Sequence, residues 1–140
     1  MSQPVSYLSI QPESALPAIV AGSPMRVVLI ADSEVSSEWQ SLASTWLVQS
    51  GCLYMMAWGN SCSSWDDSVD MANLEEFKFG PIPEERFVMT TWHTDEPLRE
   101  VFWFAKNNAF HTTVQLERTI LLHIAAEDRG QELLASYAEA

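Results

Sequence analysis

The chain has 140 residues, of which 47% are hydrophobic and 19% are charged. This composition excludes a disordered chain and indicates a single globular domain, because a chain of this length can bury roughly two-thirds of its unfolded surface. The formal net charge is −12. Such a charge repels nucleic-acid phosphates and anionic membranes, so we expect neither among the partners.

The cysteine content and the apolar runs predict a cytoplasmic protein. The two cysteines, Cys52 and Cys62, are too few for a secreted disulfide scaffold. The first residues have no basic segment before an apolar run, so we expect no signal peptide. No apolar stretch approaches the roughly 20 residues that a membrane span needs.

The first 24 residues contain four prolines and little periodicity, which predicts an N-terminal arm. Within it, residues 5–10 have the composition of an additional edge strand. Residues 25–140 are expected to form one α/β domain.

Four apolar runs rich in β-branched and aromatic residues predict buried strands over residues 25–31, 53–58, 87–92 and 119–125. Each run is followed by a helical pattern. His123, inside the last run, is expected to be a hydrogen-bonded core histidine.

Capping residues mark where the helices begin. Ser36 or Ser37 is expected to cap the first helix, and Ser63 or Ser64 the second, with acidic residues in its first turn. Asp95 is expected to cap a third helix that begins near the favourable early proline, Pro97.

This order gives four strand–helix units. It predicts a small three-layer α/β sandwich with a four-stranded, mainly parallel sheet and helices on both faces, Rossmann-like or flavodoxin-like. The corners that follow the strands then share one edge of the sheet, where ligands and partners usually bind.

One hypothesis for this edge is a nucleophilic site. Cys62 precedes a predicted helix, a position that lowers the pKa of a thiol, while His93 would act as base and Asp32 or Asp95 as its orienting group. The surrounding carboxylates oppose a thiolate, and a partly buried structural thiol is the alternative. This hypothesis would make the protein a hydrolase-like enzyme or a small-ligand binder.

Cofactor sites have weaker signals. Oxygen-rich Mg²⁺ or Mn²⁺ ligands could come from the corner residues Asp32, Asp66, Asp67, His93 and Asp95, but helix capping explains the acids equally well. Zinc-type spacings and glycine-rich phosphate loops are absent from the sequence. We therefore expect no metal and no cofactor.

A protein-binding surface is the favoured hypothesis, because tryptophans within a charged rim are typical of interface anchors. The mechanism would be occlusion of a basic partner, by a toxin-neutralising or regulatory protein. A homodimer-forming subunit is a further alternative. The expected contact residues are Trp58, Asn60, Trp65, Asp66, Asp67, Trp92, Asp95 and Glu96.

Three segments, residues 65–70, 87–93 and 100–106, resemble an uncharacterised bacterial family known only as a domain of unknown function. The resemblance covers roughly residues 25–135. It implies a bacterial source and a single compact domain, and it supplies no activity. In composition alone, the chain is also similar to acidic immunity proteins that neutralise toxins.

Overall fold

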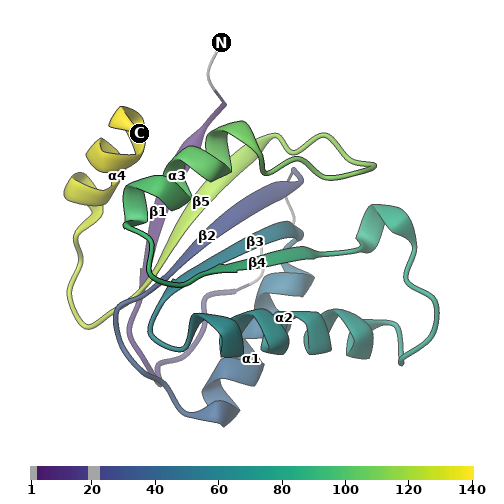
Figure 1. Ribbon diagram of the computed structural model, residues 1–140. Helices are drawn as coiled ribbons and strands as arrows, with labels where there is room; N and C mark the ends of the chain where they lie inside the picture. Colours follow the sequence, from purple (N-terminus) through teal and green to yellow (C-terminus); the bar gives the residue numbers. More distant parts are fainter. Residues whose placement is uncertain (1–2, 19–22) are drawn as a thin grey trace.

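The computed structural model describes residues 3–18 and 23–140 (Figure 1). The strands are β1 (Val5–Ile10), β2 (Met25–Ala31), β3 (Cys52–Gly59), β4 (Met89–His93) and β5 (Arg118–Ile124). The helices are α1 (Ser37–Gln49), α2 (Cys62–Glu76), α3 (Leu98–Asn107) and α4 (Gly130–Glu139), with a short 3₁₀ turn at Glu84–Arg86. No helix of the described residues is long and apolar enough to cross a membrane.

All strand pairs are parallel, in the order β1-β5-β2-β3-β4. The α/β sandwich with helices on both faces is therefore confirmed. Residues 5–10 do form an edge strand, so the predicted N-terminal arm contributes β1 to the sheet. The strands β4, β3, β2 and β5 follow the spatial order 3-2-1-4 of Rossmann-like sheets.

Two hydrophobic layers cover the sheet (Figure 1). Helices α1 and α2 pack on one face around Trp39, Leu47 and Trp65. Helices α3 and α4 pack on the other around Phe102 and Tyr137. Every residue of β2 is buried, as expected for a strand covered on both faces.

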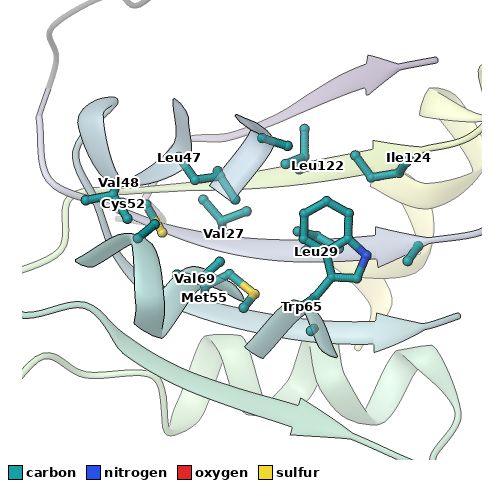
Figure 2. Packing of buried hydrophobic residues seen from close by; sticks show 14 of the residues in the cluster. Val27, Leu29, Leu47, Val48, Cys52, Met55, Trp65, Val69, Leu122 and Ile124 are labelled. Carbon is teal, nitrogen blue, oxygen red and sulfur yellow. The ribbon is translucent and has the colours of Figure 1, made fainter. Parts of the chain in front are cut away.

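Figure 2 shows the α1–α2 side of the core, where the Trp65 indole lies over Leu29 of β2. Trp65 is only 1% exposed, and its ring meets that of Trp39 edge-on at a centroid distance of 6.3 Å. Edge-to-face contacts add to the stabilisation that burial of two large rings provides. Trp65 is therefore a core residue.

The turn from β3 into α2 is tight because it passes against the end of β2. The Asn60 amide donates to the Ala31 carbonyl at 2.8 Å. Gly59 has φ +99°, and a Cβ built on it would lie 2.5 Å from the Ala31 oxygen. Only glycine fits this close approach of two backbones.

Two of the predicted helix caps are wrong, although the third helix does begin next to Pro97 as expected. Helix α2 begins at Cys62, directly after this turn; its N-cap is Ser61 in a left-handed conformation, without a side-chain cap bond, and its first turn contains no acid. The N-cap of α3 is Pro97, and Asp95 has a left-handed φ of 60° instead of capping. Ser36 does cap α1, accepting a hydrogen bond from the Trp39 amide at 3.2 Å.

Strand β4 begins two residues later than expected. The Asn73 side chain of α2 accepts from the Val88 amide at 2.9 Å and donates to the Arg86 carbonyl at 3.1 Å. These bonds replace strand pairing for the backbone at residues 86–88. The apolar pattern that predicts the strand includes Phe87 and Val88, but the backbone on both sides of Phe87 bonds to Asn73 of α2.

The Gly59–Ala31 contact predicts a large difference between two glycine substitutions. Gly59→Ala should cost more than about 3 kcal/mol of unfolding free energy, because positive φ and a backbone clash add together. Gly51→Ala is the matched control: φ is +97° but its Cβ would meet open space, so about 1 kcal/mol is expected. Urea denaturation of both variants checks this, and equal costs would contradict it.

Candidate functional site

The carboxyl edge of the sheet brings together most of the corner residues that the sequence singles out. Their side chains form two separate hydrogen-bonded groups. One group, around His93, lies between the ends of β3 and β4. The other, around His123, lies between the ends of β5 and β2 and includes Asp32.

His93 is buried, and both of its ring nitrogens are occupied. Nδ1 lies 3.1 Å from the Glu96 carboxylate, and Nε2 lies 2.9 Å from the Thr91 hydroxyl. The ring packs edge-on against Phe104 of α3, at a centroid distance of 5.1 Å. These three contacts hold the imidazole on the face of the sheet that α3 covers.

Trp58 contributes to the same local arrangement. Its indole N–H donates to the Glu96 main-chain oxygen at 2.7 Å. Together, His93 and Trp58 fix the loop between β4 and α3 against the end of β3. A structural role therefore explains both Trp58 and His93.

Cys62 contacts the other side of this loop. Its sulfur lies 3.9 Å from the His93 main-chain oxygen and 3.8 Å from the Thr94 hydroxyl. The thiol belongs to the α1–α2 core, whereas the His93 ring packs against α3. The sulfur of Cys62 thus contacts a main-chain oxygen and a hydroxyl but not the imidazole, which gives the nucleophile hypothesis no geometric support.

Asp32, one of the two expected orienting groups, pairs with a different histidine. His123 is fully buried, and its Nε2 lies 2.5 Å from the Asp32 carboxylate. Its Nδ1 lies 2.7 Å from the Tyr7 hydroxyl. His123 is therefore the hydrogen-bonded core histidine that the sequence predicts, and its partners come from β1 and from the end of β2.

The Asp32 carboxylate fixes one hydrogen-bond direction in this network, because a carboxylate accepts and His123 Nε2 is therefore the donor. His123 Nδ1 pairs with the Tyr7 hydroxyl, which also accepts from the Arg129 amide at 3.0 Å. The Arg129 side chain also reaches Asp32, at 3.4 Å. Every member has a partner, as buried polar networks require.

This network occupies the topological switch point, the crevice between β2 and β5 where Rossmann-like sheets bind ligands. The backbone closes the crevice further, because the Asp32 and Ser33 amides both donate to the Ile124 carbonyl at 3.1 Å. Here the protein itself fills the usual ligand position. Tyr7 and Arg129 could not be predicted as members of this network, because neither lies in a motif. Tyr7 meets His123, and Arg129 meets Tyr7 and Asp32, only through the strand order.

The residues expected to contact a partner divide into two sets. Trp65 is a core residue and Asp66 is only 5% exposed, so neither can reach a partner in this structure. Trp58 is half-buried. Exposed at the surface are Asn60, Asp67, Trp92, Asp95 and Glu96.

Of the three tryptophans expected to contact a partner, Trp92 is the exposed one. It is 53% exposed and lies on β4, the outermost strand on its side of the sheet. Alternation along the strand puts it on the same face as Thr90, which faces α2. The Thr90 hydroxyl donates to the Asp70 carboxylate of α2 at 2.7 Å.

Three carboxylates of α2, those of Asp66, Asp67 and Asp70, form an acidic cluster beside β4. Burial raises the pKa of Asp66, the nearby Asp70 and Asp67 raise it further, and the Thr90 hydroxyl acts in the opposite direction. Burial also raises the pKa of Asp70. Within residues 3–18 and 23–140, no Lys or Arg pairs with these acids, and Asp66 Oδ1 is buried without a hydrogen-bond partner.

The proposed metal ligands do not converge. Asp32 pairs with His123, whereas His93 contacts Glu96 on the other side of β3. Among the described residues, no three His, Cys, Asp or Glu side chains are placed to hold a metal ion.

The Tyr7 hydroxyl should be important for stability. Tyr7→Phe leaves the Arg129 amide and His123 Nδ1 without their partner, and we expect a loss of about 1–3 kcal/mol in unfolding free energy. Tyr54→Phe is the control, since Tyr54 is buried but its hydroxyl bonds to no described residue. Chemical denaturation measures both, and a loss in Tyr54→Phe as large as that in Tyr7→Phe would contradict the prediction.

Asp66→Asn should stabilise the protein at pH 7. Because the folded-state pKa of Asp66 is raised, the ionised carboxylate costs stability above that pKa and nothing below the unfolded value of about 3.9. We expect a gain of about 1 kcal/mol at pH 7 that disappears as the pH falls below 4. Thermal melts at both pH values test it, with the exposed Glu127→Gln as control. Destabilisation at pH 7 would show that the carboxylate makes a favourable interaction.

Comparison with known proteins supplies a family but no activity. No curated protein and no solved structure matches the chain. One protein family matches residues 5–140, which includes β1 and the whole sheet. The chain therefore belongs to the family described as domain of unknown function DUF7684.

Proposed function

We propose that this protein is an acidic, non-enzymatic binding domain that captures a basic partner protein at the outer edge of β4. The observation that carries the proposal is the exposed Trp92 on an edge strand, beside a cluster of carboxylates that have no cationic partner among the described residues.

The edge of β4 offers hydrogen-bonding groups to an extended segment. Its inner side pairs with β3, and it is the last strand of the sheet in that direction. An unpaired strand edge is a template for an added strand, with main-chain hydrogen bonds giving affinity and side-chain pockets giving specificity.

An apolar groove of about 370 Å³ runs beside the start of the same strand. Leu74, Ile82 and Phe87 line it, with Asp70 and Thr90 at its border. Leu74, Phe87 and Trp92 are exposed. Exposed aromatic and aliphatic side chains next to charges are the composition of an interface anchor and its rim.

The charge distribution favours a basic partner. Four exposed acids lie on the elements next to this strand edge: Asp67 and Asp70 on α2, and Asp95 and Glu96 directly after β4. A Lys or Arg side chain placed among the α2 carboxylates would relieve their mutual repulsion, and the net charge of −12 would speed its approach. Nucleic acid and anionic membranes do not fit this surface.

The partner class we propose is a basic toxin or a regulated basic enzyme in the cytoplasm, inhibited by occlusion. The acidic composition, similar to that of immunity proteins, supports this class, and the proposed bacterial source is compatible with it. Trp92 replaces Trp65 as the central contact, whereas Trp58 packs against the α3–α4 layer.

Two exposed tryptophans make a matched test. Affinity capture from the organism of origin should recover a basic protein, and its dissociation constant can then be measured by calorimetry. Trp92→Ala should weaken binding at least tenfold, as for an interface hot spot. Trp103→Ala, on α3 and 50% exposed, should leave binding unchanged.

Charge variants separate the acidic cluster from the overall charge. The double variant Asp67→Asn, Asp70→Asn should weaken and slow association, whereas Glu117→Gln, Glu127→Gln changes the net charge equally but elsewhere, and should have little effect. An acidic partner, or equal effects of the two double variants, would overturn the proposal. Dimers that form without any partner and dissociate in Trp92→Ala would instead support the homodimer alternative.

A further inference from the structure

At the amino ends of the strands, Arg26 is a buried cation that has no anionic partner in the described part of the chain. It is the second residue of β2 and is 6% exposed. Its Nε donates to the Ala109 carbonyl at 3.2 Å, and its Nη1 donates to the Gln3 and Thr119 side chains at 2.8 and 3.2 Å. Within the described residues, no carboxylate lies within ion-pair distance.

This isolation is unusual in a chain with 19 Asp and Glu residues. Buried guanidinium groups are normally paired, because removing the charge from water costs several kcal/mol. Burial accordingly lowers the pKa of Arg26. Uncharged acceptors satisfy Nε and Nη1, but Nη2 donates no hydrogen bond within residues 3–18 and 23–140.

The free nitrogen is not sealed inside the protein. In the described part of the chain, the one fully buried side-chain polar atom without a partner is Asp66 Oδ1. Arg26 lines a cavity of about 580 Å³ between α3, α4 and the starts of β2 and β5. Nη2 is thus accessible from this cavity, whose size lies within the range of small-molecule sites.

The cavity wall contains Arg26 and Lys106 and, among the described residues, no Asp or Glu, and its apolar part includes Phe110, Val114 and Tyr137. The Lys106 ammonium donates to the Ala138 and Ala140 carbonyl oxygens at 3.2 and 2.9 Å and lies 4.9 Å from the centre of the Tyr137 ring. His111 also lines it, but as a neutral ring: Nδ1 accepts from the Thr113 and Val114 amides, which leaves the proton on Nε2 for the Phe87 carbonyl.

We propose that this cavity, named here the Arg26 cavity, binds a small organic carboxylate through Arg26 Nη2, with an apolar body against Phe110 and Tyr137. A carboxylate suits the site better than a phosphate, because a single free guanidinium nitrogen is available and no glycine-rich backbone nest adds further donors. The cavity lies at the strand starts, away from β4 residue Trp92, so this site is independent of the proposed protein-binding surface.

Benzoate is a suitable probe, with uncharged benzamide as its isosteric control and phenyl phosphate as the competing anion. Binding is followed by ¹H–¹⁵N NMR on the full chain, using the Arg26 Nε–H and Ala109 amide resonances. Benzoate should shift both resonances and bind at least tenfold more tightly than benzamide. Equal binding of the two, or no shift with benzoate, would overturn the proposal, and tighter binding of phenyl phosphate would overturn the choice of carboxylate.

Two variants and a control test which cation binds the carboxylate of benzoate. Arg26→Gln should weaken benzoate at least tenfold and leave benzamide unchanged. Arg118→Gln is the matched control, because Arg118 also lies at a strand start but lines a different cavity, next to Leu122 and Trp46. If Arg26→Gln does not fold, Lys106→Gln should still weaken benzoate several-fold, and unchanged affinity there would count against the site.

Discussion

The central strand β2 pairs in parallel with β3 on one side and with β5 on the other, and the rest of the structure depends on this double pairing. Parallel neighbours cannot be joined by hairpins, so the connections from β2 to β3, from β3 to β4 and from β4 to β5 each cross a face of the sheet through a helix. The two helical layers follow from this requirement. It also collects every strand-to-helix corner at one edge and leaves the strand starts, with Arg26, at the other.

The same pairing explains the position of the buried polar network. His123 lies opposite Ile30 of β2, so Asp32, two residues further on, faces the same side of the sheet as the imidazole. Tyr7 reaches that imidazole because β1 adds to the far side of β5. Three strands and the start of α4 are thereby joined by side chains at the position where related sheets usually hold a ligand.

Periodicity was sufficient to predict most of the fold. The runs at residues 5–10 and 25–31 have the predicted bounds, because an apolar β-branched run has few alternatives to a strand. The start of β4 was misplaced because the Asn73 side chain takes over backbone bonds that the sequence cannot reveal. The start of α2 was misplaced because the Gly59 turn is set by contact with Ala31, a residue from another strand.

The functional candidates were harder to predict, since they depend on which face each side chain occupies. Cys62 and His93 are close along the sheet edge, but the thiol belongs to one core and the imidazole to the other. Arg26 gave no signal at all, because a basic residue at the start of a strand is ordinarily a solvated one. Its isolation becomes visible only when its neighbours are known.

The acidic cluster beside β4 also affects how copies of this protein meet each other. Pairing two β4 edges would bring the carboxylates of both α2 helices close together, so like-charge repulsion protects a strand edge that is otherwise suited to aggregation. That protection depends on ionisation. Near the isoelectric point of about 4.4, the repulsion is lost while Trp92 and Phe87 stay exposed, and the protein becomes prone to self-association. The acids that we propose attract a basic partner would thus also keep copies of the protein apart.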